Sequence, residues 1–196
     1  MRERRSLDPN AVLEDHVKYL RRLIWYVSSR LLALCLILGL ITMVFYFSMN
    51  ATNIYIILKD GMAKRAQVVM MGADESLLTP YFSAGYIDRD PMLMEARNGQ
   101  SSYQNNYSIT GFDHRINLDW VWCWPWEDSA RATITERIPA IDGKLRASAR
   151  DTAAAMGTPL PSIPKWQTTQ YTVYLSRENN QWRIRNLTVS KVINEE

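Results

Sequence analysis

The sequence is poor in cysteine and histidine, with two of each in 196 residues. Cys35 lies in an apolar run near the amino end and Cys123 lies in the segment DWVWCWPWED, so we expect no disulfide between them. His114 and Cys123 fall on opposite faces of a predicted strand, and a zinc site needs three or four such ligands. We therefore expect neither a metal centre nor a cofactor.

Motifs for common chemistries are also missing. The sequence has no glycine-rich phosphate loop and no serine-nucleophile motif. Residues 51–196 contain sixteen basic and sixteen acidic residues. Nucleic-acid-binding domains carry an excess of positive charge, so this balance argues against a nucleic-acid partner. We expect a domain that is not an enzyme.

Charge is absent from one long run. Residues 31–49 read LLALCLILGLITMVFYFSM, and no charged residue follows before Lys59. A helix rises ~1.5 Å per residue, so this run nearly crosses a hydrocarbon core of ~30 Å and predicts a transmembrane helix over residues 31–53. A buried core helix is the alternative. A cleaved signal peptide fits less well, because its apolar stretch has about 7 to 15 residues and its basic leader is short.

Basic residues gather before this run and predict its orientation. Residues 1–30 hold seven basic and four acidic residues, and the positive-inside rule places them in the cytoplasm. We therefore expect a single-pass protein of the cell membrane whose residues 54–196 are extracytoplasmic. The leader is predicted to be an interfacial helix that begins near Ser6 and Asp8, with a docking surface for a cytoplasmic partner as the alternative. The residues expected at the headgroups or in an aromatic belt are Arg21, Arg22, Trp25 and Tyr26. The basic residues of the leader are Arg2, Arg4, Arg5, Lys18, Arg21, Arg22 and Arg30.

Helical signals follow the span. Apolar residues at helical spacing predict an amphipathic helix over residues 54–71, and Gly72 would end it. Asp74 is typical of an N-cap and predicts a second helix that fades by Gly85. Asp90-Pro91 predicts a short third helix. Residues 97–106 read as loop.

The rest of the chain has the pattern of strands. Alternation predicts one long strand over 107–126 whose even positions are buried, with pairing ended by Pro125. A second strand over 130–138 carries small Ala130 and Ala132, which we interpret as space for the indole rings. An aromatic ligand or partner surface is the alternative. Residues 142–165 are predicted to be a long mobile or partner-binding loop, and a final hairpin turns at 178–180, with a bulge between Ile184 and Leu187.

Two ionisable residues fall among apolar neighbours. His114 and Glu136 lie on adjacent predicted strands whose buried faces should meet, and such a pair could act as acid and base, line a ligand pocket or form a structural hydrogen bond. The residues of the hypothetical pocket are Tyr81, His114, Glu136, Trp120, Trp122 and Trp124.

The order of elements resembles a known superfamily. An anchor, two helices, a short helix and four strands closing with QWRIRNLTV are similar to the cone-shaped α+β fold of the nuclear transport factor two superfamily. The layout resembles its membrane-anchored members, the inner-membrane assembly factors of type IV secretion and conjugation systems, and DWVWCWPWED resembles single-span proteins of clostridial-type bacteria. The resemblance implies a scaffold that binds other envelope proteins, or itself. A ligand-binding or enzymatic cone cavity is the alternative.

Overall fold

The computed structural model describes residues 9–194, with the side chains described from Lys18 onward. The chain forms two compact units, one ending at Tyr46 and the other beginning at Phe47. The second unit begins about two helical turns before residue 54, the predicted start of the exported domain. The predicted helix-start residues Ser6 and Asp8 lie outside the described residues, as do the leader residues Arg2, Arg4 and Arg5.

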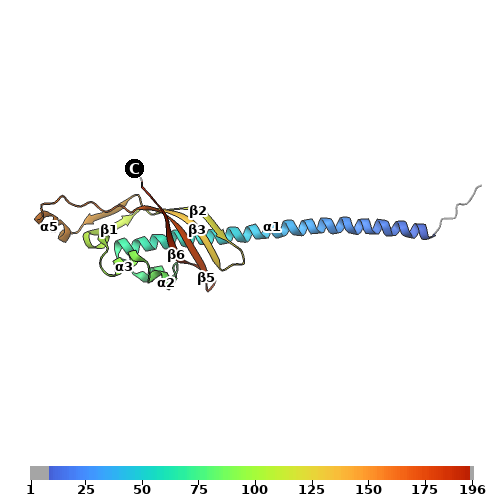
Figure 1. Ribbon diagram of the computed structural model, residues 1–196, viewed down its shortest axis with the longest axis horizontal. Coiled ribbons are helices and arrows are strands. Elements are labelled where there is room, and N and C mark those ends of the chain that lie inside the picture. Colours follow the sequence, from blue (N-terminus) through green and yellow to red (C-terminus); the bar gives the residue numbers. More distant parts are fainter. Residues whose placement is uncertain (1–8, 195–196) are drawn as a thin grey trace, which may run out of the picture. The chain divides into compact units, whose positions relative to one another are not determined.

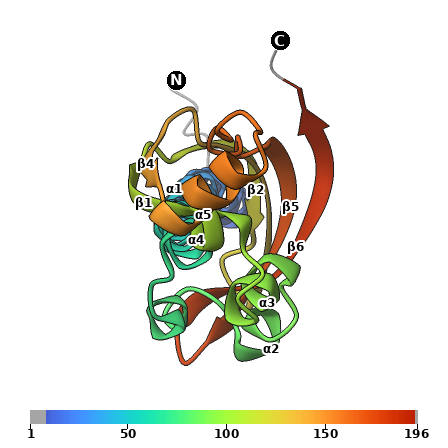
Figure 2. The same cartoon turned by 90° about the vertical axis from the view of Figure 1, so that its left-hand side faces the viewer.

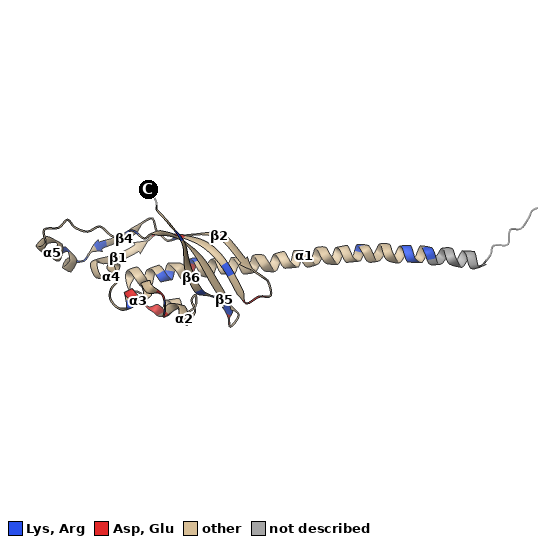
Figure 3. Ribbon diagram, in the orientation of Figure 1, with Lys and Arg blue, Asp and Glu red and all other residues tan. Residues whose placement is uncertain are grey.

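One continuous helix, α1 (Pro9–Met71), replaces the separate leader helix, span and amphipathic helix of the prediction (Figure 1). In the described part of the chain it is the one helix long and apolar enough to cross a membrane. Its charged residues lie toward the two ends, and the intervening stretch has none (Figure 3). This uncharged stretch is consistent with a single-pass membrane protein.

The part of α1 after Phe47 is a core element of the second unit. Ile54, Leu58 and Met62 are fully buried and belong to one hydrophobic cluster with the inward residues of the sheet. The helix lies close to its neighbours at Gly61, where a Cβ atom would lie 2.9 Å from the Cβ of Tyr81. The helix ends before Gly72, whose φ of +69° suits a residue without a side chain.

Four short helical segments follow: η1 (Glu75–Leu78), α2 (Ala84–Ile87), α3 (Pro91–Arg97) and α4 (Ser102–Asn106). Asp74 caps η1 by accepting the N–H of Ser76, as the sequence predicts. The predicted second helix is wrong beyond Leu78, because Pro80 has no backbone N–H to continue the helical hydrogen bonds, and α2 begins only at Ala84. The loop predicted over 97–106 contains α4. Ser101 Oγ, at its start, donates to the carbonyl of Val69, 2.9 Å away.

The strands form two antiparallel sheets, so the fold is α+β. The larger sheet has four strands in the order β2 (Arg115–Cys123), β3 (Ser129–Arg137), β5 (Thr168–Glu178) and β6 (Gln181–Ile193). The smaller pairs β1 (Tyr107–Phe112) with β4 (Ile141–Leu145). Within the second unit, Figure 2 shows β1 and β4 on one side of the part of α1 after Phe47 and β5 and β6 on the other.

Two predictions about the strand region are wrong. The single strand predicted over 107–126 is divided at Asp113 and His114, because β1 pairs with β4 whereas β2 pairs with β3. The loop predicted over 142–165 contains most of β4 and all of α5 (Ala147–Ala155). Gly143 is required in β4, since a Cβ there would lie 2.9 Å from the carbonyl oxygen of Ser108. The alanines of α5 favour a helix.

The closing hairpin follows its prediction closely. Asn179 and Asn180 have φ values of 50° and 64°, as a two-residue hairpin turn of type I′ requires. The register between β5 and β6 shifts here: Leu175 pairs with Ile184 and Tyr174 with Asn186, so β6 has one extra residue between its two partners. This confirms the predicted bulge. Beyond the bulge, Val189 is 56% exposed.

Candidate functional site

His114 and Glu136 are in contact, as their predicted strand positions indicated. His114 Nε2 lies 2.9 Å from Glu136 Oε1, and the indole Nε1 of Trp166 donates to Glu136 Oε2 at 3.3 Å. The side chain of Glu136 is 0% exposed and that of His114 is 6% exposed. The carboxylate therefore has a partner on each oxygen and no contact with solvent.

This geometry fits a structural role. His114 follows β1, Glu136 lies in β3 and Trp166 precedes β5, so the three side chains connect segments that are distant in sequence. A general acid or base must reach the proton that it transfers. The enclosed carboxylate offers no such approach from solvent in this structure.

Replacing Glu136 by alanine should therefore destabilise the domain. The change leaves the indole N–H of Trp166 and the imidazole of His114 without their hydrogen-bond partner in the core, and each buried unsatisfied group costs about 1–3 kcal/mol. Chemical unfolding of the purified chain in detergent measures the loss. Glu127→Ala, at an exposed position, is the control, and equal stability of the two variants would contradict the structural role.

A second buried polar group joins α1 to the start of α3. Arg65 Nε and Nη2 donate to Asp90 at 2.5 and 3.1 Å, and the hydroxyl of Tyr86 also donates to Asp90. Arg65 and Asp90 are 4% and 2% exposed. Asp90 also accepts the backbone N–H of Met92 and so caps α3.

The charges of this group depend on one another. Burial alone would raise the pKa of Asp90, but the Arg65 charge and the hydrogen bonds hold it below its ordinary value. Burial raises the pKa of the Tyr86 hydroxyl well above its usual range, and the nearby Arg65 charge only partly offsets this. The group therefore consists of a cation, an anion and a neutral phenol at neutral pH.

Arg65 and Tyr86 were absent from the candidate residues that the sequence suggested, and Asp90 was recognised only as a helix cap. One signal was present. Arg65 follows Leu58 and Met62 at the spacing of a single helix face, and Val69 continues that face. An arginine in register with a buried stripe indicates an internal partner, but the partner itself lies 25 residues away in sequence.

A pocket of about 320 Å³ lies beside this group. Arg65 Nη1 is buried and has no hydrogen-bond partner among the described residues. A guanidinium with a spare N–H is suited to a carboxylate or phosphate oxygen. The lining residues are Arg65, Tyr86, Arg89, Asp90, Pro91, Met92, Tyr171, Asn186, Leu187 and Val189.

The tryptophans of DWVWCWPWED do not fill the core in the predicted manner. The register of β2 against β3 shifts between Leu118 and Trp120, which changes the face on which later side chains lie. After the shift, Val121 pairs with Ala132 and Cys123 with Ala130, so the small alanines lie opposite these residues instead of the indoles. The exposed fractions of Trp120, Trp122 and Trp126 are 49%, 48% and 70%.

Cys123 lies on the buried side of this strand. It is 0% exposed, and its thiol lies 3.8 Å from the carbonyl oxygen of Phe47. Burial raises the pKa of the thiol, and the charge of Arg177 offsets part of that effect. Cys123 therefore packs in the core as a small buried side chain.

The six residues of the hypothetical pocket do not share one lining. Only His114 and Glu136 have a hydrogen bond to each other. Tyr81 lines a different hollow of about 340 Å³ with Asn53 and Trp182. Trp122 lines a further hollow with Arg131 and Tyr174, while Trp120 is exposed and Trp124 stacks on Trp122.

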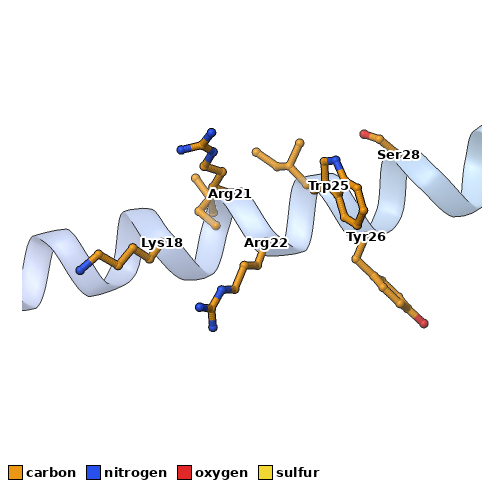
Figure 4. Close-up of a pocket in the computed structure, with 8 residues that line it drawn as sticks. Lys18, Arg21, Arg22, Trp25, Tyr26 and Ser28 are labelled. Atoms are coloured by element: carbon orange, nitrogen blue, oxygen red, sulfur yellow. The ribbon is translucent and has the colours of Figure 1, made fainter.

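A hollow on the first unit is lined by residues of α1 alone. Figure 4 shows Lys18, Arg21 and Arg22 on this helix, followed by Trp25 and Tyr26. These side chains are exposed, and the guanidinium of Arg30 lies 5.3 Å from the centre of the Tyr26 ring. Basic residues followed by aromatic residues are the arrangement of a membrane interface.

Comparisons with protein-family models, curated proteins and solved structures find no match to this chain.

Proposed function

We propose that the protein is a bitopic component of a cell-envelope complex, with its leader in the cytoplasm and its second unit outside the cell membrane. The uncharged stretch of α1 and the excess of basic residues before it support this orientation. The second unit is proposed to have the cone-shaped fold of the nuclear transport factor two superfamily. A core helix packed with a four-stranded sheet supports that assignment, as do the bulges in β2 and β6, which favour curvature.

The proposed role is to bind other proteins as a scaffold or assembly component, and the observation that carries it is the outer edge of β6. This strand ends the larger sheet, and the isolated bridge from Ile184 to Phe82 is a local contact near its start. Beyond it, Val189 and Val192 are 56% and 43% exposed. An open edge with apolar side chains can accept a strand of a partner. Tethering to the membrane raises the effective concentration of the domain toward other envelope proteins.

Site-specific photocrosslinking tests this role. A photoreactive amino acid at Val189 or Val192 should give a crosslink to another protein, or to a second copy, in intact membranes. The same group at Glu95, an exposed position of α3, is the matched control. Absence of any crosslinked protein from the β6 positions would contradict the scaffold role.

The buried Nη1 of Arg65 favours a second candidate function, the binding of a small anion in the pocket beside Asp90 and Tyr86. A ligand that binds only the folded state raises the unfolding temperature. A panel of small carboxylates and inorganic phosphate, screened by thermal unfolding of the full chain in detergent, tests this function. No shift with any compound would reject it for these ligand classes.

A further inference from the structure

Three indole rings at the end of β2 and just beyond it form a continuous series of ring contacts. Trp122 and Trp124 lie 5.6 Å apart with an interplanar angle of 23°, and Trp124 meets Trp126 edge-on at 4.9 Å. We call Trp122, Trp124 and Trp126 the tryptophan cluster. Trp122 is about half exposed and Trp126 is 70% exposed, which is costly in water for the largest aromatic side chain.

The tryptophan cluster lies beside the start of the second unit, where the uncharged run of α1 continues. The ring of Trp122 contacts that of Phe47, with centroids 6.2 Å apart at an angle of 62°. Nearby, Arg177 donates to the side-chain oxygen of Asn50 at 2.9 Å. The end of the larger sheet is therefore fixed against residues that the sequence assigns to the transmembrane segment.

The length of the uncharged run places these contacts at the membrane border. A hydrocarbon core of ~30 Å needs ~20 helical residues, which, counted from Leu31, end at about Asn50. Phe47 lies about one turn inside that limit, so the indole that contacts it lies at the level of the interface. Tryptophan is enriched at this level because its ring is apolar and its N–H is polar.

We propose that the tryptophan cluster docks into the lipid interface of the extracytoplasmic leaflet, beside the point where α1 leaves the membrane. The cluster then forms the outer aromatic belt, as Trp25 and Tyr26 form the inner one. This contact fixes the end of the larger sheet at the bilayer surface. The inference depends on the span of α1 and not on the proposed protein partner.

The charges beside the tryptophan cluster indicate whether the headgroup charge of the lipid should affect docking. Glu127 and Asp128 follow Trp126 directly and are exposed, whereas Arg131 and Arg185 line a hollow with Trp122 and Glu127, so the tryptophan cluster has charges of both signs beside it and no clear positive excess. Attraction to anionic headgroups therefore does not account for the contact. We expect docking in purely zwitterionic membranes, with little effect of salt.

Quenching of tryptophan emission tests the proposal. The full chain carrying Trp25→Phe, which removes the indole of the inner belt, is reconstituted in phosphatidylcholine vesicles that contain chain-brominated phosphatidylcholine. We expect bromine to quench a component of the emission, and we expect the combined changes Trp122→Phe, Trp124→Phe and Trp126→Phe to remove most of it. Trp182→Phe, at a position 4% exposed in the domain core, is the matched control and should retain it.

Three results would overturn the proposal. In the first, aqueous iodide quenches the emission of the tryptophan cluster in vesicles and brominated lipid does not. This result would indicate that the cluster faces water or protein. Another is lipid quenching that requires phosphatidylglycerol or disappears in high salt. The third is equal lipid quenching with and without the cluster. Flotation of every variant with the vesicles separates these results from a failure of α1 to insert.

Discussion

Replacing Asp90 by alanine should lower the free energy of unfolding of the domain by about 3–5 kcal/mol, because it leaves the guanidinium of Arg65 charged and unpaired in the interior. The change also removes the acceptor for the Tyr86 hydroxyl and the cap of α3. Denaturant unfolding of the full chain in detergent, followed by circular dichroism, measures the loss. We expect the midpoint to fall steeply or the variant to be unfolded before denaturant is added.

The matched control is an ion pair of the same kind at the surface. Arg97 donates from two nitrogens to Glu75, at 3.1 and 2.8 Å, but both side chains are at least one-third exposed. Solvent screens such a pair, so Glu75→Ala should shift the midpoint far less than Asp90→Ala. Similar losses from the two variants would show that the buried pair does not support the domain as the structure indicates.

Leu58→Ala should destabilise the domain by about 2–5 kcal/mol, as truncation of a fully buried leucine does in other cores. Leu58 is 0% exposed and lies in the hydrophobic cluster that joins α1 to the sheet. The prediction is informative because α1 also contains the uncharged run. The Leu58→Ala variant therefore tests whether the helix that continues from the span is also the core helix of the second unit.

The control for this prediction is Ile56→Ala, a truncation on the same helix at a side chain that is 48% exposed. It should cost clearly less, because fewer contacts are lost and no cavity forms inside the core. Thermal unfolding of both variants in detergent gives the comparison. A larger loss for Ile56→Ala would mean that the opposite face of α1 is the buried one.

The predictions from sequence succeeded where the signal is local. The uncharged run, the caps at Asp74 and Asp90 and the turn at Asn179-Asn180 each depend on neighbouring residues, and the structure has a helix, helix starts and a hairpin turn at these places. The contact of His114 with Glu136 also followed, because both lie near the same pair of adjacent strands.

The prediction that the tryptophans of DWVWCWPWED fill the core is wrong because of one bulge in β2. The bulge, between Leu118 and Trp120, changes the face of the sheet on which the later side chains lie. Up to Leu118 the even positions face the core, but after the register shift Val121 and Cys123 do so. The sequence showed the change as an odd face that becomes apolar beyond Asp119. A shift in register explains this pattern without a second layer covering the other face of the strand.

Non-local pairing explains the other errors. Nothing in the segment from Tyr107 to Trp126 indicates that its first part pairs with β4, which lies about 30 residues further along the chain. The strand β4 was missed within the predicted loop for the same reason, because its partner β1 is distant in sequence, and α5 lies in the same loop. Arg65 was missed for a similar reason, since its partner Asp90 belongs to another element and no local rule connects them.

Cysteine labelling across the membrane tests the central claim, that α1 spans the cell membrane and displays the second unit outside. Cys35 and Cys123 are replaced by alanine, and a single cysteine is introduced by Ser148→Cys in α5, an exposed position, or by Ser6→Cys in the leader. A membrane-impermeant maleimide should label the Ser148→Cys chain in intact cells and the Ser6→Cys chain only after permeabilisation. Labelling of the Ser148→Cys chain only after permeabilisation would contradict the account.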